Sequence, residues 1–223
     1  MFFPERIQSI RPGDRVLEIG PGSTPHPRSD AFLELAYEAE AERLAQRGGT
    51  TPEPDLRGKP IHRYDGGRFP FDDRAFDYVI CSHVIEHVPD PLGFVAELNR
   101  VSGGRGYIEY PLLPYEYLYD FDVHLHFVRF DRASGKLRFM PKSEAGTQRF
   151  SPVGAFFRRT LEQGWDELSA CNREVFFEGF EFLSPLVAAP TDRLEDLMPP
   201  LSMIRRKSRL RWLLGSVLRR VGL

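Results

Sequence analysis

The chain has 223 residues, 41% of them hydrophobic and 28% charged, which suits a folded protein with a substantial core. Its formal net charge of −2 excludes a general attraction to nucleic acid. Two cysteines, Cys81 and Cys171, are too few for a disulfide framework, so we expect a reducing compartment. The N-terminus lacks the apolar core of a secretory signal, and no apolar run is long enough to span a membrane. We therefore expect a cytoplasmic protein.

The first half of the chain alternates short apolar runs with polar segments, as in a parallel sheet with crossover connections. This pattern predicts strands at 15–19, 31–35, 60–64, 76–82 and 106–110. A helix is predicted over 38–47. Asp90 followed by Pro91 has the features of an N-cap and first turn, and predicts a second helix that runs through Leu98.

The second half has a different character. The segment "HLHFVRFDRASGKLRFMPK" predicts two strands joined by a turn at 133–135. His124 and His126 lie two residues apart on the first of these strands, so we expect both to face the same side. A helix is predicted over 152–168, a strand within 173–183, and a linker over 189–200.

The end of the chain, 201–223, contains seven Lys or Arg residues and no Asp or Glu. Its apolar residues recur at helical spacing, with Arg209, Arg211, Arg219 and Arg220 on the opposite face. We expect a basic amphipathic helix that either contacts the inner face of an anionic membrane peripherally, packs against the acidic remainder of the chain, or mediates self-association.

The stretch "VLEIGPGSTPHP" ends the first predicted strand with Gly20 and Gly22. The third glycine of a dinucleotide fingerprint is missing, so the loop favours a nucleoside ligand without a diphosphate. Glu34 ends the second apolar run, where an acidic side chain accepts hydrogen bonds from ribose hydroxyls in nucleotide-binding sheets. The alternative for Glu34 is an ordinary exposed glutamate.

The segment "YDGGRFPFDDRAFDYVICSHVIEHVPDPLGFVAELNRVSGGRGYIEYP", together with "VLEIGPGSTP", resembles the class I S-adenosylmethionine-dependent methyltransferases, especially the broad group that acts on small molecules and glycans. The resemblance covers 15–111. It implies an α/β fold with a Rossmann-like, doubly wound, mostly parallel sheet, followed by C-terminal α+β additions. It also implies S-adenosylmethionine as cofactor. Residues 1–111 would bind the cofactor, and 112–188 would complete the sheet and bind the acceptor.

The resemblance implies that Glu18, Gly20 and Gly22 cradle the methionine part of the cofactor, and that Glu34 binds its ribose. The segment after Glu34 departs from the usual helix and spacing, so this residue is the least secure of the set.

Further along the chain, the resemblance implies that Asp65 accepts from the adenine amino group, with the Gly66 backbone beside the ring. Ser82 and His83 would lie beneath the methionyl group and the transferable methyl.

A hydroxyl acceptor needs a base within hydrogen-bond reach of its proton. We predict His87, His124 and His126 as catalytic candidates, and His83 is a further candidate. For His124 and His126, a solvated strand face or a hydrogen-bonded core position is the alternative.

"HVIEH" also matches an inverted zinc-protease motif, but a strand runs into it and Pro89 follows, which excludes the required helix. Some methyltransferases of this fold carry metal ligands as E-x-x-E-H here. A divalent ion at His83, Glu86 and His87, with His124 or His126 as a distant ligand, is therefore an alternative. We predict no metal.

The sequence thus predicts a methyltransferase acting on an oxygen of a small molecule or saccharide, without DNA as a partner. The alternatives are an RNA methyltransferase and a catalytically inactive methyltransferase fold that binds a partner. The near-neutral charge disfavours the first, and the intact Glu18, Gly20, Gly22 and Asp65 disfavour the second.

Overall fold

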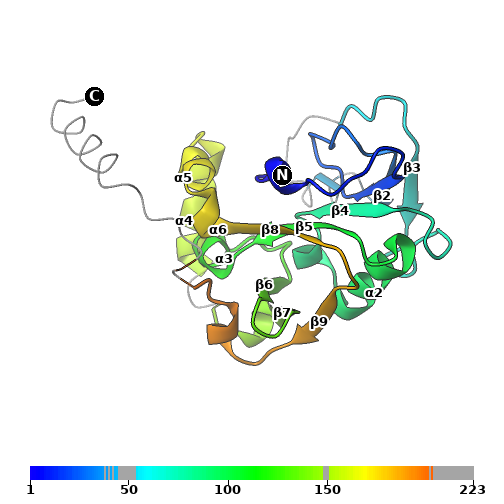
Figure 1. Ribbon diagram of the computed structural model, residues 1–223. Helices are drawn as coiled ribbons and strands as arrows, with labels where there is room; N and C mark the ends of the chain where they lie inside the picture. The colour runs from blue at the N-terminus through cyan, green and yellow to red at the C-terminus, as the bar shows by residue number, and fades with distance from the viewer. Residues whose placement is uncertain are drawn as a thin grey trace, which may run out of the picture.

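The computed structural model describes residues 1–37, 39, 41, 43, 44, 54–147, 151–200 and 202. Six strands form the main sheet, in the order β3-β2-β1-β4-β5-β8 (Figure 1). Their bounds are β1 Val16–Ile19, β2 Ala31–Leu35, β3 Ile61–Tyr64, β4 Tyr78–Ser82, β5 Gly106–Pro111 and β8 Phe177–Phe182. Strands β1 to β5 are parallel and β8 is antiparallel to β5. The predicted fold class is confirmed, and the five strands predicted in the first half lie within two residues of their expected positions.

The strand order reverses direction at β1, because β2 and β3 lie on one side of it and β4 and β5 on the other. Ligands of such sheets bind beyond the carboxyl ends of the strands at this switch point. The loops after β1, β2 and β4 are therefore where a site is expected.

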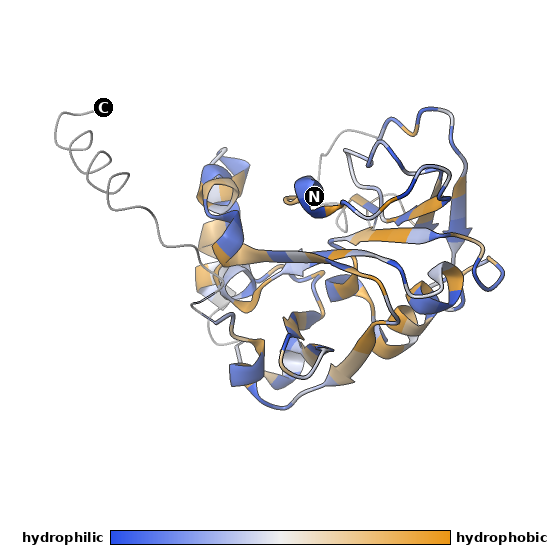
Figure 2. Ribbon diagram, in the orientation of Figure 1, coloured by the Kyte–Doolittle hydropathy of each residue, from blue (hydrophilic) through white to orange (hydrophobic). Residues whose placement is uncertain are grey.

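Both faces of the main sheet are covered. Figure 2 shows hydrophobic residues concentrated in the central strands, with hydrophilic residues mostly at the periphery. On one face, Leu17, Val79 and Ile108 pack in a large core with residues of α2 and of a smaller sheet. On the other face, Val16 and Tyr78 pack with the N-terminal residues Met1, Ile7 and Ile10. The N-terminal segment, which includes η1 Pro4–Arg6, thus lies across the sheet opposite α2 (Figure 1).

Helix α2, Pro91–Ser102, begins where the sequence predicts and includes Leu98, the last residue named in the prediction. The Asp90 side chain accepts from the Gly93 amide at 3.0 Å, and Gly103 ends the helix in the left-handed region. The buried face carries Phe94, Val95, Leu98 and Val101, which anchor the helix to the sheet.

A second sheet has the order β6-β7-β9, formed by β6 His126–Asp131, β7 Lys136–Pro141 and β9 Val187–Pro190. The predicted hairpin is confirmed. The predicted linker 189–200 is packed instead, because Pro190 pairs with Phe139 of β7 and Leu197, in η5 Leu194–Leu197, is fully buried. Because this segment has few apolar residues, the sequence does not indicate the end of β9 or the burial of Leu197.

Helix α3, Leu113–Tyr119, lies between β5 and β6 in the sequence. Among the described residues, four further helices lie between β7 and β8, namely η3 Lys142–Glu144, α4 Ser151–Glu162, α5 Glu167–Cys171 and α6 Arg173–Phe176. The single helix predicted over 152–168 is wrong, because Gly164 takes a φ of +86° and its amide caps the turn at Leu161. The strand predicted within 173–183 starts only at Phe177, where pairing with the last residue of β5, Pro111, begins.

Two predictions fall outside the residues that the structure describes, namely most of the helix over 38–47 and the amphipathic helix over 201–223. Among the described residues, no helix is both long enough and apolar enough to cross a membrane.

Candidate active site

A cavity of about 440 Å³ opens beyond the carboxyl ends of β1, β2 and β4. Its wall includes nine of the eleven predicted site residues: Glu18, Gly20, Gly22, Glu34, Gly66, Ser82, His83, His87 and His124. Asp65 and His126 are not part of the wall. The rest of the wall comes from neighbouring residues of the same strands and loops, from the N-terminus, from the segment around 115–124 and from Phe177.

The loop after β1 is shaped by two glycines and one buried carboxylate. Gly20 has a φ of +62°, and a Cβ there would lie 2.6 Å from Cγ2 of Val84. The Glu18 carboxylate accepts from the His26 amide at 2.9 Å and from the Ser29 hydroxyl at 2.6 Å. Burial raises the pKa of Glu18 despite these hydrogen bonds. Glu18 therefore fixes the course of the loop from inside it.

Glu34 lies at the carboxyl end of β2 and pairs with Arg63 of β3, which is opposite it in the strand register. Gly66 follows β3 and contributes to the cavity wall. Asp65 is exposed, and its side chain accepts from the Gly67 amide at 3.0 Å as part of a local turn. The Asp65 carboxylate is thus directed at its own loop rather than at the cavity.

His83 follows β4 with a φ of +56°, which is unusual for a residue other than glycine. Its Nε2 lies 3.1 Å from Oε1 of Glu109, and its Nδ1 lies 3.4 Å from Oε1 of Glu86. Burial by itself lowers the pKa of His83, but its contacts with Glu109 and Glu86 outweigh burial and raise it to about 9. The ring is therefore a cation at neutral pH, and it lies between the carboxylates of Glu109 and Glu86.

Glu109 connects the N-terminal segment to the cavity. Its fully buried carboxylate accepts from the Phe2 amide at 2.7 Å, the Phe3 amide at 2.9 Å and the Tyr107 hydroxyl at 2.6 Å. Burial raises the pKa of Glu109, but the hydrogen bond from His83, supported by Tyr107, outweighs burial and holds the pKa at about 2.

The same network positions Phe2 over the cavity. The Ser82 hydroxyl also donates to Glu109, at 3.0 Å. The Phe2 ring stacks on Phe177 with centroids 3.8 Å apart. It also packs edge-to-face against the His83 ring, with centroids 5.5 Å apart. Phe2 and Phe177 thus form an aromatic wall beside His83.

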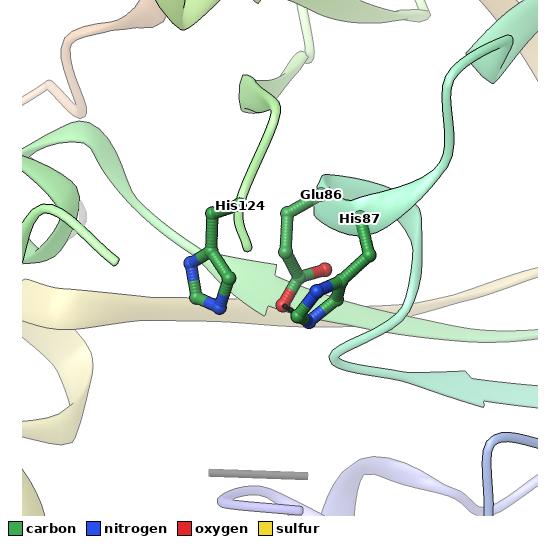
Figure 3. A group of neighbouring side chains, drawn as sticks. All are labelled: Glu86, His87 and His124. Atoms are coloured by element: carbon green, nitrogen blue, oxygen red, sulfur yellow. Dashed lines mark ion pairs between the residues drawn. The ribbon is translucent and has the colours of Figure 1, made fainter. Parts of the chain in front are cut away.

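A second group of side chains lies at the Nδ1 side of the His83 ring, whereas Glu109 lies at its Nε2 side. The short helix η2, Ile85–His87, carries Glu86 and His87, and the Leu125 amide donates to the Glu86 carbonyl at 2.7 Å. This backbone contact brings His124 beside them. Figure 3 shows the three side chains reaching in the same direction from two separate segments. One ligand atom from each of the three residues lies within 4.8 Å of those of the other two.

Each histidine of this group is oriented by a hydrogen bond at Nδ1. His87 Nδ1 lies 3.1 Å from the Val123 carbonyl, and His124 Nδ1 lies 2.5 Å from Oε1 of Glu116. Burial lowers the pKa of His87 to about 4, so this ring is neutral at pH 7. Burial raises the pKa of Glu86, but His83 and His87 outweigh burial and lower it.

His126 lies elsewhere. Strand β6 begins at His126, whereas His124 belongs to the preceding turn, so the prediction that both share one strand face is wrong. The His126 ring is buried against Phe139, with centroids 5.6 Å apart, and burial lowers its pKa.

Comparison with known proteins identifies a domain in part of the chain. The family described as "Methyltransferase domain" matches residues 29–108, the segment that contains β2, β3, β4 and the first residues of β5, with the loops after β2, β3 and β4. Residues 29–108 therefore carry a methyltransferase domain. A search of curated proteins finds no match to this chain.

Among solved structures, about half of the chain is similar to several others at low sequence identity. A Thermotoga maritima SAM-dependent methyltransferase has 20% identity and a TM-score of 0.39, with 55% of this chain and 59% of that chain covered. The YcgJ protein of Bacillus subtilis has 20% identity and a TM-score of 0.35, with 50% and 52% covered. A Mesorhizobium loti SAM-dependent methyltransferase has 18% identity and a TM-score of 0.32, with 58% of each chain covered. The match spans less than two thirds of each of these structures.

The residues around the cavity fit S-adenosylmethionine, the cofactor that the match to a methyltransferase domain implies. Gly20 and Gly22 both have positive φ, and at Gly22 a Cβ would meet no atom within 4 Å, so this part of the loop is open to a ligand. Glu34 supplies a carboxylate at the end of β2, where ribose hydroxyls bind in such sheets. Leu35, Tyr37 and Tyr64 provide a largely apolar wall for a base.

Several residues of the cavity wall and of its hydrogen-bond network are not among the predicted ones. The sequence does single out Glu109, because a charged residue within the apolar run "GYIEYP" is unusual in a buried strand. Glu116 stands in the aromatic segment "PYEYLYDF" without a pattern that indicates burial. Phe2 and Phe177 come together only through long-range contacts, which sequence spacing does not indicate.

Proposed function

We propose that this chain transfers the methyl group of S-adenosylmethionine to a hydroxyl oxygen of a small molecule or saccharide. The observation that carries the proposal is a single cavity that joins the loops after β1, β2 and β4 to the imidazoles of His87 and His124. A cofactor end and a proton-accepting end therefore share one space.

When bound, S-adenosylmethionine supplies an electrophilic methyl group on a sulfonium, which a nucleophile displaces in line. In this proposal, the backbone from Gly20 to Gly22 lies against the methionine part, and Glu34 accepts from the ribose hydroxyls once it releases Arg63. Asp65 reaches the adenine only after its carboxylate leaves the Gly67 amide. Ser82 and His83 close the wall at the end of β4.

At the other end, His124 accepts the acceptor's hydroxyl proton in the metal-free chain. With the Glu116 carboxylate as the acceptor of this hydrogen bond, His124 Nδ1 carries the hydrogen and Nε2 keeps a lone pair. When Nε2 takes the proton, Glu116 stabilises the imidazolium ring and holds it in place. Glu116 is 1% exposed, so this support is strong.

The walls favour an acceptor with a flat or ring-shaped body. Phe2, Tyr115, Phe121 and Phe177 line the cavity, and His87 and His124 are among its polar groups. Aromatic walls with a few polar groups are typical of sites for small ligands, including sugar rings and phenols.

Mass-shift screening tests this proposal. The chain is incubated with S-adenosylmethionine that carries a deuterated methyl group and with pools of phenols, alcohols and saccharides. We expect a labelled methyl ether in at least one pool, and His124→Ala lowers its formation by about 100-fold or more, as for loss of a general base. A labelled nitrogen or carbon product, or normal turnover by His124→Ala, contradicts the proposed chemistry.

A further inference from the structure

The carboxylate of Glu86 is the least explained buried group near the cavity. Glu86 is 0% exposed, and neither of its carboxylate oxygens has a hydrogen-bond partner among the described residues. A buried charge without hydrogen bonds is costly, so such a group calls for an explanation, of which an ion that is not drawn is one. The nearest ionisable groups are His83 Nδ1 at 3.4 Å and His87 Nε2 at 3.9 Å.

The two adjacent histidines are oriented as metal ligands usually are. The Val123 carbonyl can only accept, so His87 Nδ1 carries the hydrogen and its Nε2, the nitrogen nearer Glu86, keeps a lone pair. His124 has the same arrangement, with Glu116 as the acceptor at Nδ1. A ligating histidine almost always donates its other ring N–H to a carboxylate or a backbone carbonyl, and both kinds of partner are present here.

We propose that Glu86, His87 and His124 bind one divalent transition-metal ion, such as Zn²⁺, Mn²⁺ or Co²⁺, at the wall of the cavity. Two imidazoles and one carboxylate suit these ions, whereas Mg²⁺ prefers oxygen ligands and several waters. Three protein ligands leave at least one coordination position for water or an acceptor oxygen.

The surrounding structure holds the three ligands at close range. The Leu125 amide donates to the Glu86 carbonyl at 2.7 Å, which fixes the His124 segment against η2. Lys142 Nζ lies 2.8 Å from Asp120 and 3.4 Å from Oε2 of Glu116, so it steadies the carboxylate that orients His124. The three ligand atoms, already within 4.8 Å of one another, need only small side-chain rotations to share an ion.

The competing explanation is that His83 alone compensates Glu86. The His83 ring contacts Oε1 of Glu86 at 3.4 Å, but it lies closer to Glu109, at 3.1 Å. It leaves the second oxygen of Glu86 without a hydrogen bond. If His83 is the only partner that Glu86 has, then the chain binds no cation at this place, and the two explanations differ in a measurable way.

The role of the ion rests on the proposed function, whereas its binding does not. A bound cation contacts the acceptor oxygen and lowers the pKa of its hydroxyl, whose proton passes to water. The deprotonated oxygen then forms the C–O bond as the C–S bond of the sulfonium breaks. In this loaded form, His124 is a ligand rather than the base.

Titration with Co²⁺ tests the site without cofactor or acceptor. The full chain, stripped of metal and carrying Cys171→Ser to remove its exposed thiol, is titrated while visible absorption is recorded. We expect bands of nitrogen-ligated Co²⁺ that saturate at one ion per chain, and a rise in melting temperature with Zn²⁺. Absence of saturable binding by the folded chain overturns the proposal.

Variants locate the site. Glu86→Gln and His124→Gln weaken Co²⁺ binding at least about tenfold, and Glu116→Gln, a positioning variant, weakens it about 10- to 100-fold. His62→Gln, a matched control on β3 at the far side of the sheet, leaves binding unchanged. Circular dichroism of each metal-free variant establishes that it is folded. Should a variant not fold, the Co²⁺ spectrum of the parent chain still decides whether the ligands are nitrogens.

The same preparations separate this inference from the proposed function. S-adenosylhomocysteine binding reports the cofactor end alone, so a chain that binds S-adenosylhomocysteine but no cation contradicts only the metal site. A chain that binds Co²⁺ but not S-adenosylhomocysteine contradicts only the proposed function. Equal Co²⁺ affinity in the parent chain and in folded Glu86→Gln places the ion elsewhere and overturns the assignment.

Discussion

His124 Nδ1 lies 2.5 Å from Oε1 of Glu116, a fully buried carboxylate eight residues earlier in the chain. This short, charge-assisted contact holds one imidazole of the cavity wall in a single orientation, with its other nitrogen available to a ligand. Whether that nitrogen takes a proton or a metal ion, its position depends on Glu116.

Replacing Glu116 by glutamine removes the charge and keeps the shape. We expect kcat to fall about 10- to 100-fold while the KM for S-adenosylmethionine stays the same, because only the orientation and basicity of His124 change. Steady-state kinetics with varied cofactor provides the measurement.

Glu178→Gln is the matched control, since Glu178 is equally buried and bonded to Tyr110 but lies outside the cavity wall. Equal losses of kcat in both variants show that a general loss of stability, rather than the position of His124, explains the effect.

Gly20→Ala tests the loop after β1. The new methyl group meets Cγ2 of Val84 at 2.6 Å on a backbone with positive φ, so the loop and Val84 must move apart. We expect S-adenosylhomocysteine affinity to fall at least about tenfold and the free energy of unfolding to fall by about 1–3 kcal/mol.

Gly13→Ala separates the backbone cost from the clash. Gly13 has a φ of +88°, but a Cβ there meets no atom within 4 Å, and Gly13 is not part of the cavity wall. We therefore expect Gly13→Ala to be less stable than the parent chain but to bind S-adenosylhomocysteine with unchanged affinity, as measured by calorimetry. A parallel loss of affinity in both variants argues against a specific role for the Gly20 loop.

Phe2→Ala tests the aromatic wall. The Phe2 ring stacks on Phe177 and meets His83, and its loss opens the cavity beside that residue. An aromatic pair of this kind contributes about 0.5–1.5 kcal/mol, so ligand affinity should fall by about two- to tenfold. The affinity of Phe156→Ala, at an exposed position on α4, should not change.

Acid should weaken the tie between Glu109 and the N-terminal segment. The pKa of Glu109 is about 2, against 4.5 for an ordinary glutamate, so the ionised carboxylate stabilises the fold above pH 4.5. This contribution, of about 3 kcal/mol, is lost as the pH falls from 4.5 through 2.

Chemical denaturation of the parent chain and of Glu109→Gln between pH 7 and pH 2.5 measures it. The difference in unfolding free energy should be constant above about pH 5 and should shrink below pH 4.5. A difference that does not vary with pH shows that Glu109 acts through shape rather than charge.

The sheet was largely predictable because its strands are short apolar runs bounded by turn residues. Ala31–Leu35 begins and ends as the pattern predicts, and Asp90 caps α2 as its position before Pro91 indicates. The helix over 152–168 was not, because Gly164 interrupts a segment whose composition otherwise favours a helix throughout. Local patterns describe elements well where no single backbone conformation overrides them.

The site was predictable only where it lies at strand ends. Glu34 and Ser82 follow strands and reach the cavity, whereas His126 lies within β6 and turns into the core. The approach of His124 to Glu86 depends on one backbone hydrogen bond between Leu125 and Glu86, across 39 residues of sequence. No periodicity signals such a contact.

Calorimetric titration with S-adenosylhomocysteine tests most directly whether this cavity is the cofactor site. We predict one saturable site per chain, weakened at least about tenfold by Glu34→Ala through loss of charge-assisted hydrogen bonds to the ribose. Arg63→Ala frees the same carboxylate and should leave the affinity unchanged or higher. No detectable binding to the folded chain, or equal affinity in the parent chain and in Glu34→Ala, would contradict the account.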